Sequence, residues 1–288
     1  MLIRDRSSDS LFERLQSFTP YRGRYLGRRA KRRVLSRRTR LSVAVCAITL
    51  TVAALSCTES ATVVIHPNQD TSIYSESDNS NAVGALYSGT TNRDAIRRAL
   101  LRFDIAGSIP PGATIDSVSL TLTQTKISPG VTALFELRPL RADWGEGTSF
   151  GSGAGALPSP GDATWNFRRF NTNTWNSPGG DAGAPSGTAT IGTGVGVTYT
   201  FGSQAGMVAD VQSWLNTPGT NFGWLLRAAN ESPAITSARE FGSRESDLTQ
   251  QPTLTINFTP VPEPGTAGLL GAAAMLSCVR RRRSRPFG

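Results

Sequence analysis

Residues 98–123 read RALLRFDIAGSIPPGATIDSVSLTLT, and this stretch contains two strands and the turn between them. Side chains alternate between the two faces of a strand, so a period of two identifies each face. In the first strand one face is apolar: Ala99, Leu101 and Phe103. In the second strand the apolar residues also alternate: Val118, Leu120 and Leu122. Between them, residues 109–112 read IPPG; proline fixes φ and glycine permits positive φ, which predicts a turn joining two antiparallel strands.

The rest of residues 61–259 repeats this pattern of short strands and polar turns. Further strands are predicted at 61–65, 70–74, 85–87, 131–137, 188–201, 224–228 and 254–258. Between 206 and 216 apolar residues recur at helical spacing, which predicts a short amphipathic helix. We therefore predict an all-β fold: an antiparallel, jelly-roll-like β-sandwich with one short helix, flanked by an N-terminal signal segment and a C-terminal membrane-anchor helix. The predicted divisions of the chain are 1–57, 61–259 and 260–288.

The formal net charge of +9 is distributed unevenly along the chain. Residues 1–40 hold 13 of the 30 basic residues and three of the 21 acidic ones, and five more arginines lie within 280–285. Between residues 41 and 279 this leaves 12 basic and 18 acidic residues, so the predicted folded part is acidic. A nucleic-acid partner needs a basic surface on the folded domain. We therefore expect no nucleic-acid partner.

Both ends of the chain carry features of export and membrane targeting. Residues 41–55 form an uncharged apolar run after a basic segment, as in a signal peptide, although residues 54–57 also resemble a lipobox. Near the other end, Pro262-Glu263-Pro264 precedes an apolar run at 267–279, and four arginines follow directly. By the positive-inside rule such a cluster holds the cytoplasmic end of a short membrane anchor. We expect an exported protein that is transiently anchored in the inner membrane.

The C-terminal tail resembles the PEP-CTERM sorting signal. The Pro-Glu-Pro triplet, the short apolar segment and the terminal arginine cluster occur in the same order over residues 261–285. The resemblance implies processing by an exosortase near Pro262, Glu263 and Pro264. It also implies a location in the cell envelope or extracellular matrix of a Gram-negative bacterium, in association with exopolysaccharide.

Residues 69–258 resemble the DNRLRE, or disaggregatase-related, domain family. The matching pieces are DTSI at 70–73, NAVG at 81–84, LLRFD at 100–104, IPPGA at 109–113, WGEG at 144–147, ATW at 163–165, Val211 with Trp214, and FGSRE at 241–245. The resemblance implies a β-sandwich grouped with carbohydrate-binding modules, and polysaccharide, including acidic polysaccharide, as the ligand. The chain departs from the family in its enlarged segment at 145–184.

Residues 143–184, called the insertion below, are rich in glycine, serine and asparagine but also carry three tryptophans. A flat indole ring stacks on the C–H face of a sugar, and guanidinium groups bind uronate carboxylates. We predict ligand binding by Trp175, which we expect to be exposed, together with Arg168, Arg169, Arg98 and Arg102. The alternative for Arg102 is a structural ion pair with Asp104 or Glu245, and for the family-motif tryptophans Trp144 and Trp165 it is a place in the core.

A structural calcium ion is a further hypothesis. Asp70, Asp78, Asn79 and Asn81 supply hard oxygen ligands on an early loop, and the three cysteines lie outside residues 61–259, so no disulfide stabilises that part. The alternative is an ordinary solvated turn formed by these aspartate and asparagine side chains.

Enzyme chemistry has little support in the sequence. His66 is the only histidine and has no nucleophile motif beside it, while Asp143 and Glu146 could serve as glycosidase carboxylates, as many surface pairs could. We therefore expect a non-catalytic sandwich that binds extracellular or cell-surface polysaccharide. The alternatives are a structural or adhesive matrix protein without a specific glycan ligand, and a polysaccharide lyase or glycosidase.

Overall fold

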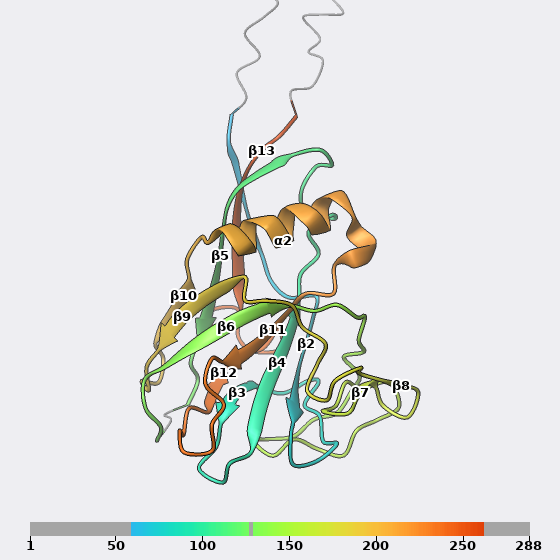
Figure 1. Ribbon diagram of the computed structural model, residues 1–288. Coiled ribbons are helices and arrows are strands. Elements are labelled where there is room, and N and C mark those ends of the chain that lie inside the picture. The colour runs from blue at the N-terminus through green and yellow to red at the C-terminus, as the bar shows by residue number, and fades with distance from the viewer. Residues whose placement is uncertain (1–58, 127–128, 262–288) are drawn as a thin grey trace, which may run out of the picture. The chain divides into compact units, whose positions relative to one another are not determined.

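The computed structural model describes residues 59–126 and 129–261 (Figure 1). The predicted signal segment, the Pro262-Glu263-Pro264 motif and the anchor at 267–279 lie outside these residues. Within the described ranges, no helix is both long and apolar enough to span a membrane.

The described residues form antiparallel sheets with one α-helix, which is consistent with the predicted all-β sandwich. The smaller sheet has four strands, in the order β1 (Ala61–Ile65), β13 (Thr253–Thr259), β5 (Thr114–Thr123) and β10 (Thr198–Phe201). The two strands of the opening stretch therefore lie in different sheets, because β5 belongs here and β4 belongs to the larger sheet.

The larger sheet has seven strands. Six follow the order β12 (Arg239–Phe241), β3 (Leu86–Thr90), β4 (Ile96–Arg102), β11 (Trp224–Ala228), β6 (Ala133–Pro139) and β9 (Gly187–Ile191). The seventh, β2 (Gln69–Tyr74), pairs with β4 in a register that places Asp70 opposite Leu101. A separate ribbon within the insertion consists of β7 (Phe167–Arg169) and β8 (Asn173–Thr174).

The predicted helix is confirmed as α2 (Ala205–Asn216), which is followed by a short 3-10 turn, η2 (Pro218–Thr220). Its buried residues recur at helical spacing: Met207, Val211, Trp214 and Leu215. The strand character predicted over 188–201 is confirmed at both ends of the segment, which contains two strands rather than one. This segment forms β9 and β10, which belong to different sheets, because the chain turns between them at Gly196, where φ is +72°.

The two sheets and α2 share one apolar core. The larger sheet contributes Leu101 and Leu226 among others, and the smaller sheet contributes Leu120 and Ile256. The indole rings of Trp214 in α2 and Trp224 in β11 meet edge to face, with their centroids 4.6 Å apart.

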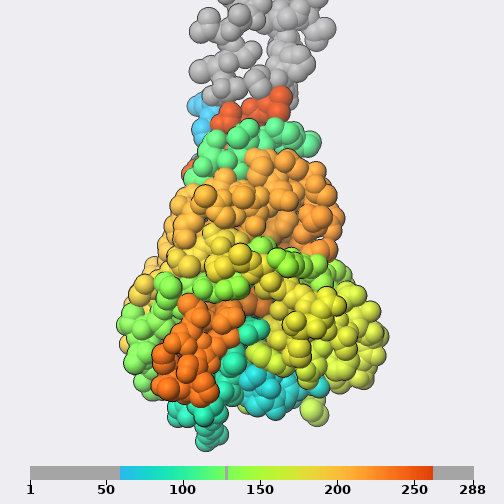
Figure 2. Space-filling model, viewed as in Figure 1, coloured from blue at the N-terminus to red at the C-terminus, as the bar shows by residue number. Residues whose placement is uncertain are grey.

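A second apolar cluster lies on the other face of the larger sheet, under the insertion. Leu100 of β4 points into it, while its neighbour Leu101 points into the first core. The members of this outer core are Ile73, Leu100, Leu140, Trp144, Ala163, Trp175 and Leu225. In Figure 2 the insertion forms a continuous yellow-green surface on one side of the molecule. The larger sheet is therefore buried on both faces where the insertion covers it.

Leu100→Ala tests whether the outer core stabilises the fold. Leu100 is fully buried, so its truncation removes apolar contacts and leaves a cavity. We expect the free energy of unfolding to fall by about 2–5 kcal/mol, measured by urea denaturation of the purified chain. Leu134→Ala is the matched control, because Leu134 is 46% exposed and its loss should cost less than about 1 kcal/mol. Equal effects of the two substitutions would contradict a buried outer face.

Candidate functional site: an arginine cluster and an acidic cluster

Residues 143–146, with the sequence DWGE, cross the outer face of the larger sheet at the start of the insertion. The Trp144 side chain is fully buried in the outer core, and its indole N–H donates to the carbonyl of Phe222 at 2.9 Å. A Cβ at Gly145 would collide with the carbonyl oxygen of Gly161, so only glycine fits there. These constraints fix the segment and direct the carboxylates on either side of it, those of Asp143 and Glu146, into two different charge clusters.

The first is the arginine cluster, which we define as Arg102, Arg168, Arg169 and Asp143. Arg102 Nη1 lies 3.2 Å from Asp143 Oδ1, and Arg169 Nη2 lies 2.5 Å from Asp143 Oδ2. Arg168 Nη1 donates to the backbone carbonyl of Asp143 at 3.0 Å. The structure thus gathers three of the arginines that the sequence predicted as ligand-binding residues, one from β4 and two from β7. Arg102 pairs with Asp143, so the predicted structural partners Asp104 and Glu245 are wrong.

The arginine cluster carries more positive than negative charge. The guanidinium groups of Arg102 and Arg169 pair with the carboxylate of Asp143, while that of Arg168 bonds to the Asp143 backbone carbonyl and forms no ion pair among the described residues. The cluster is also open to solvent, since the side chains of Arg169 and Asp143 are 39% and 41% exposed. Exposed ion pairs contribute little to stability, because water and salt screen the charges. The cluster can therefore accept a further carboxylate from outside.

Arg98, the other predicted cation of β4, forms a separate and mostly buried interaction. Its guanidinium forms two hydrogen bonds with Glu231, of 2.9 and 2.7 Å, and a third with the carbonyl of Gly179 at 2.7 Å. It also lies over the ring of Trp165, 4.7 Å from the centroid. Its side chain is 14% exposed, so these contacts attach the insertion to the sheet.

The expectation that Trp175 is exposed is wrong. Its side chain is 4% exposed and belongs to the outer core, and its indole N–H donates to the carbonyl of Thr164 at 2.9 Å. The ring is buried because the insertion needs its own apolar residues to pack on the apolar outer face of the larger sheet. Trp175 therefore presents no open face on which a sugar could stack.

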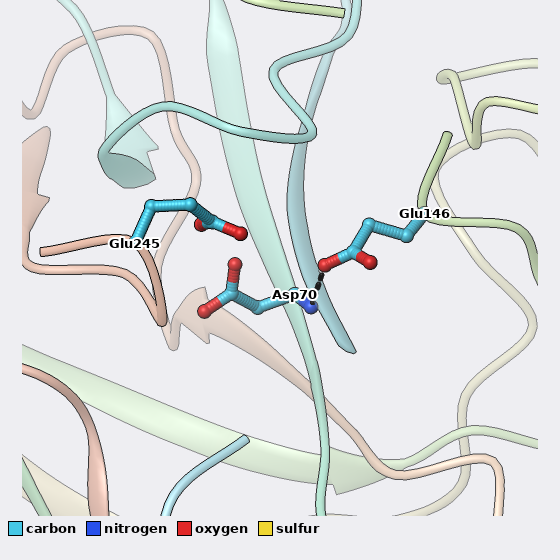
Figure 3. Close-up of side chains that lie close together, drawn as sticks. All are labelled: Asp70, Glu146 and Glu245. Atoms are coloured by element: carbon cyan, nitrogen blue, oxygen red, sulfur yellow. Dashed lines mark hydrogen bonds between the residues drawn. The ribbon is translucent and has the colours of Figure 1, made fainter. Parts of the chain in front are cut away.

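The second is the acidic cluster, which we define as Asp70, Glu146 and Glu245. One carboxylate oxygen from each residue lies within 4.8 Å of the others (Figure 3). Glu146 Oε1 accepts hydrogen bonds from the backbone N–H of Asp70 at 2.8 Å and from Arg244 Nε at 2.6 Å. The same Nε lies 2.8 Å from Glu245 Oε1. Arg244 is thus the cation that faces these three carboxylates.

Asp70 is the buried member of the acidic cluster. Its Oδ2 accepts the backbone N–H of Arg244 at 2.8 Å, but its Oδ1 is buried and has no hydrogen-bond partner among the described residues. Burial raises the pKa of Asp70 well above its usual value, and the neighbouring Glu245 and Glu146 carboxylates add to this rise against the effect of Arg244. Burial also raises the pKa of Glu245.

The four predicted calcium ligands do not act together on one loop. Asp70 lies in β2 and belongs to the acidic cluster, whereas Asp78, Asn79 and Asn81 form hydrogen bonds with the insertion. Asp78 Oδ1 accepts hydrogen bonds from the side chains of Thr164 and Asn166. Asn79 Nδ2 donates to the carbonyl of Ala154, and Asn81 Oδ1 accepts the backbone N–H of Gly151. These three residues thus attach the loop after β2 to the insertion.

The sequence analysis did not identify Glu146 and Glu245 as neighbours of Asp70. The signal available was that each of the three is an acidic residue inside a family-like piece: DTSI, WGEG or FGSRE. Comparison of the sequence with protein-family models and with curated proteins found no match, so it identifies no further site residues.

The raised pKa of Asp70 predicts a specific pH dependence. A carboxyl group whose pKa is raised by folding favours the folded state while it is protonated, and this contribution is lost as the pH rises through the raised value. In a buffer with a chelator, wild type should therefore lose stability relative to Asp70→Asn as the pH rises from about 4 towards 8.

Urea denaturation at a series of pH values measures this difference in the free energy of unfolding. Asp181→Asn serves as the control, because Asp181 lies outside the acidic cluster and bonds locally to Asn176 and Ser177. A difference between wild type and Asp70→Asn that stays constant over the pH range would show that Asp70 does not titrate as described.

Proposed function

We propose that this chain is an exported, non-catalytic, jelly-roll-like β-sandwich that binds acidic polysaccharide at the arginine cluster. The observation that carries the proposal is the gathering of three guanidinium groups at Asp143, two on its half-exposed carboxylate and one on its backbone carbonyl. The acidic balance of residues 41–279 makes this local excess of positive charge more specific, because it is not part of a generally basic surface.

The chemistry of the cluster suits uronate residues. A guanidinium group offers planar, paired N–H donors that match a carboxylate, and it is less strongly hydrated than an ammonium group. Asp143 already holds Arg102 and Arg169 in place, so their orientation does not have to be established when a ligand binds. A uronate carboxylate would then be bound by Arg168 and Arg169.

We further propose that the terminal segments deliver the sandwich to the cell envelope or extracellular matrix. The apolar run at 41–55 supports export, and the Pro262-Glu263-Pro264 motif with the apolar run at 267–279 supports transient inner-membrane anchoring and exosortase processing. Exported polysaccharides occur in the same location. The partner and the location are therefore mutually consistent.

A non-catalytic role fits the state of the two acids that could have formed a glycosidase pair. Asp143 is bound by Arg102 and Arg169, and Glu146 is bound by Arg244 and the backbone of Asp70. A general acid must be able to give its proton to the leaving oxygen, and a nucleophile must reach the sugar. Carboxylates that are held by arginines are poorly suited to both tasks.

The proposal predicts selective binding of the purified full-length chain to a polyuronate. Affinity for the polyuronate should exceed that for the same polymer with its carboxylates reduced to alcohols, and it should fall as salt is added. Replacing both Arg168 and Arg169 by Gln should weaken binding by at least about tenfold, since a charge-assisted hydrogen bond contributes about 1.5–3 kcal/mol. Biolayer interferometry on immobilised polymer measures these affinities.

Arg141→Gln is the control, because Arg141 is an exposed arginine near the start of the insertion and outside the arginine cluster. Equal affinity for the charged and the reduced polymer would contradict recognition by arginine. A folded protein that binds no glycan would favour a structural or adhesive matrix role, and release of reducing or unsaturated ends would indicate an enzyme.

A further inference from the structure

We propose that Asp70, Glu146 and Glu245 bind a calcium ion, which joins three segments of the chain that are distant in sequence. The three carboxylates come from β2, from the start of the insertion and from the loop between β12 and β13. This site differs from the loop site expected from the sequence, with which it shares only Asp70. Its occupation does not require polysaccharide to be bound at the arginine cluster.

The unpartnered oxygen of Asp70 is the first argument. Asp70 is fully buried, and its Oδ1 has no hydrogen-bond donor among the described residues. A buried carboxylate oxygen without a donor lowers the stability of the fold, because it has lost its hydrogen bonds to water and has formed none within the protein. In Figure 3 the Asp70 carboxyl group faces that of Glu245, within the acidic cluster. A cation bound there would satisfy the unpartnered oxygen.

The balance of charge is the second argument. Among the described residues, three carboxylates face the guanidinium of Arg244, so the fully ionised cluster carries two excess negative charges. The carboxylate of Asp70 is buried, and a buried charge is found paired or bound to a metal, because the uncompensated form is strongly disfavoured. A divalent cation brings the cluster to neutrality. One further arginine or lysine would leave one negative charge uncompensated.

Three protein carboxylates favour calcium over magnesium, because magnesium usually keeps several waters and takes only one or two carboxylates. Calcium binds carboxylates at about 2.3–2.6 Å in variable geometry, so two ligands on opposite sides of the ion lie up to about 4.6–5.2 Å apart. Magnesium requires about 2.0–2.1 Å and a regular octahedron, which limits the same separation to about 4.2 Å. The ligand oxygens here lie within 4.8 Å of one another, which is compatible with the span of a calcium ion.

The existing hydrogen bonds hold the ligands in place before any ion binds. Glu146 accepts the backbone N–H of Asp70, and Asp70 accepts the backbone N–H of Arg244. Each of the three segments is therefore already attached to another. Calcium would strengthen these attachments and, through residues 143–146, would stabilise the part of the insertion that carries Asp143.

The experiment is a thermal unfolding scan of the full-length chain after dialysis against EDTA. Calcium is added to about 1 mM, which is about 100 times a Kd of ~10 μM. This addition should raise Tm by about 5 °C or more, and magnesium should raise Tm by less. Isothermal titration calorimetry should show one calcium ion bound per chain. Glu245→Gln should abolish most of the calcium-dependent rise, while Glu240→Gln, which removes a carboxylate in β12 outside the cluster, should keep it.

Asp70→Asn separates ligand loss from unfolding. Its amide oxygen can still accept the N–H of Arg244, so the variant should fold in EDTA, but its Tm should no longer respond to calcium. An EDTA-treated wild type that binds no calcium and shows no calcium-dependent rise in Tm would overturn the proposal. A Glu245→Gln variant that keeps the full calcium-dependent rise in Tm would also overturn the proposal. An equal rise in Tm with magnesium would overturn the choice of calcium.

Discussion

Strand β4 is covered on both of its faces, and the rest of the structure depends on this constraint. Leu101 packs in the core between the sheets, whereas Leu100 packs under the insertion. The apolar outer face of the larger sheet is stable only when other apolar groups exclude water from it, and Trp144 and Trp175 of the insertion do so. The two arginines that flank the outer Leu100, Arg98 and Arg102, then lie at the edges of this covered area and bind the insertion through polar contacts.

Residues 143–146 connect packing with charge. Trp144 holds the segment in the outer core, and the residues on either side of it supply one carboxylate to each charge cluster. The positions of Asp143 and Glu146 are thus consequences of where one indole packs. A change in the packing of the insertion would therefore alter the arginine cluster and the acidic cluster together, although no described side chain belongs to both.

Local patterns in the sequence predicted most of the elements but few of their partners. The period of two in residues 98–104 and 118–123 identified β4 and β5, and the spacing of apolar residues identified α2. The same stretch contained a sign of the covered outer face, because Leu100 interrupts a face that is otherwise charged. No local sequence pattern indicated that Asp70 lies beside Glu146 and Glu245. Their proximity depends on strand register and loop paths between residues more than 70 positions apart.

Burial determines what each charge cluster can do. The arginine cluster has excess positive charge at a surface, where water and salt reduce the cost of unpaired charge, so the cluster is stable without a ligand and its charge supports the proposed binding of an anionic polymer. The acidic cluster has excess negative charge around a fully buried Asp70, where water cannot compensate it. Such a group must take up either a proton or a cation. The raised pKa of Asp70 describes the first choice, and because the two compete for the same oxygens, calcium should bind more weakly as the pH falls.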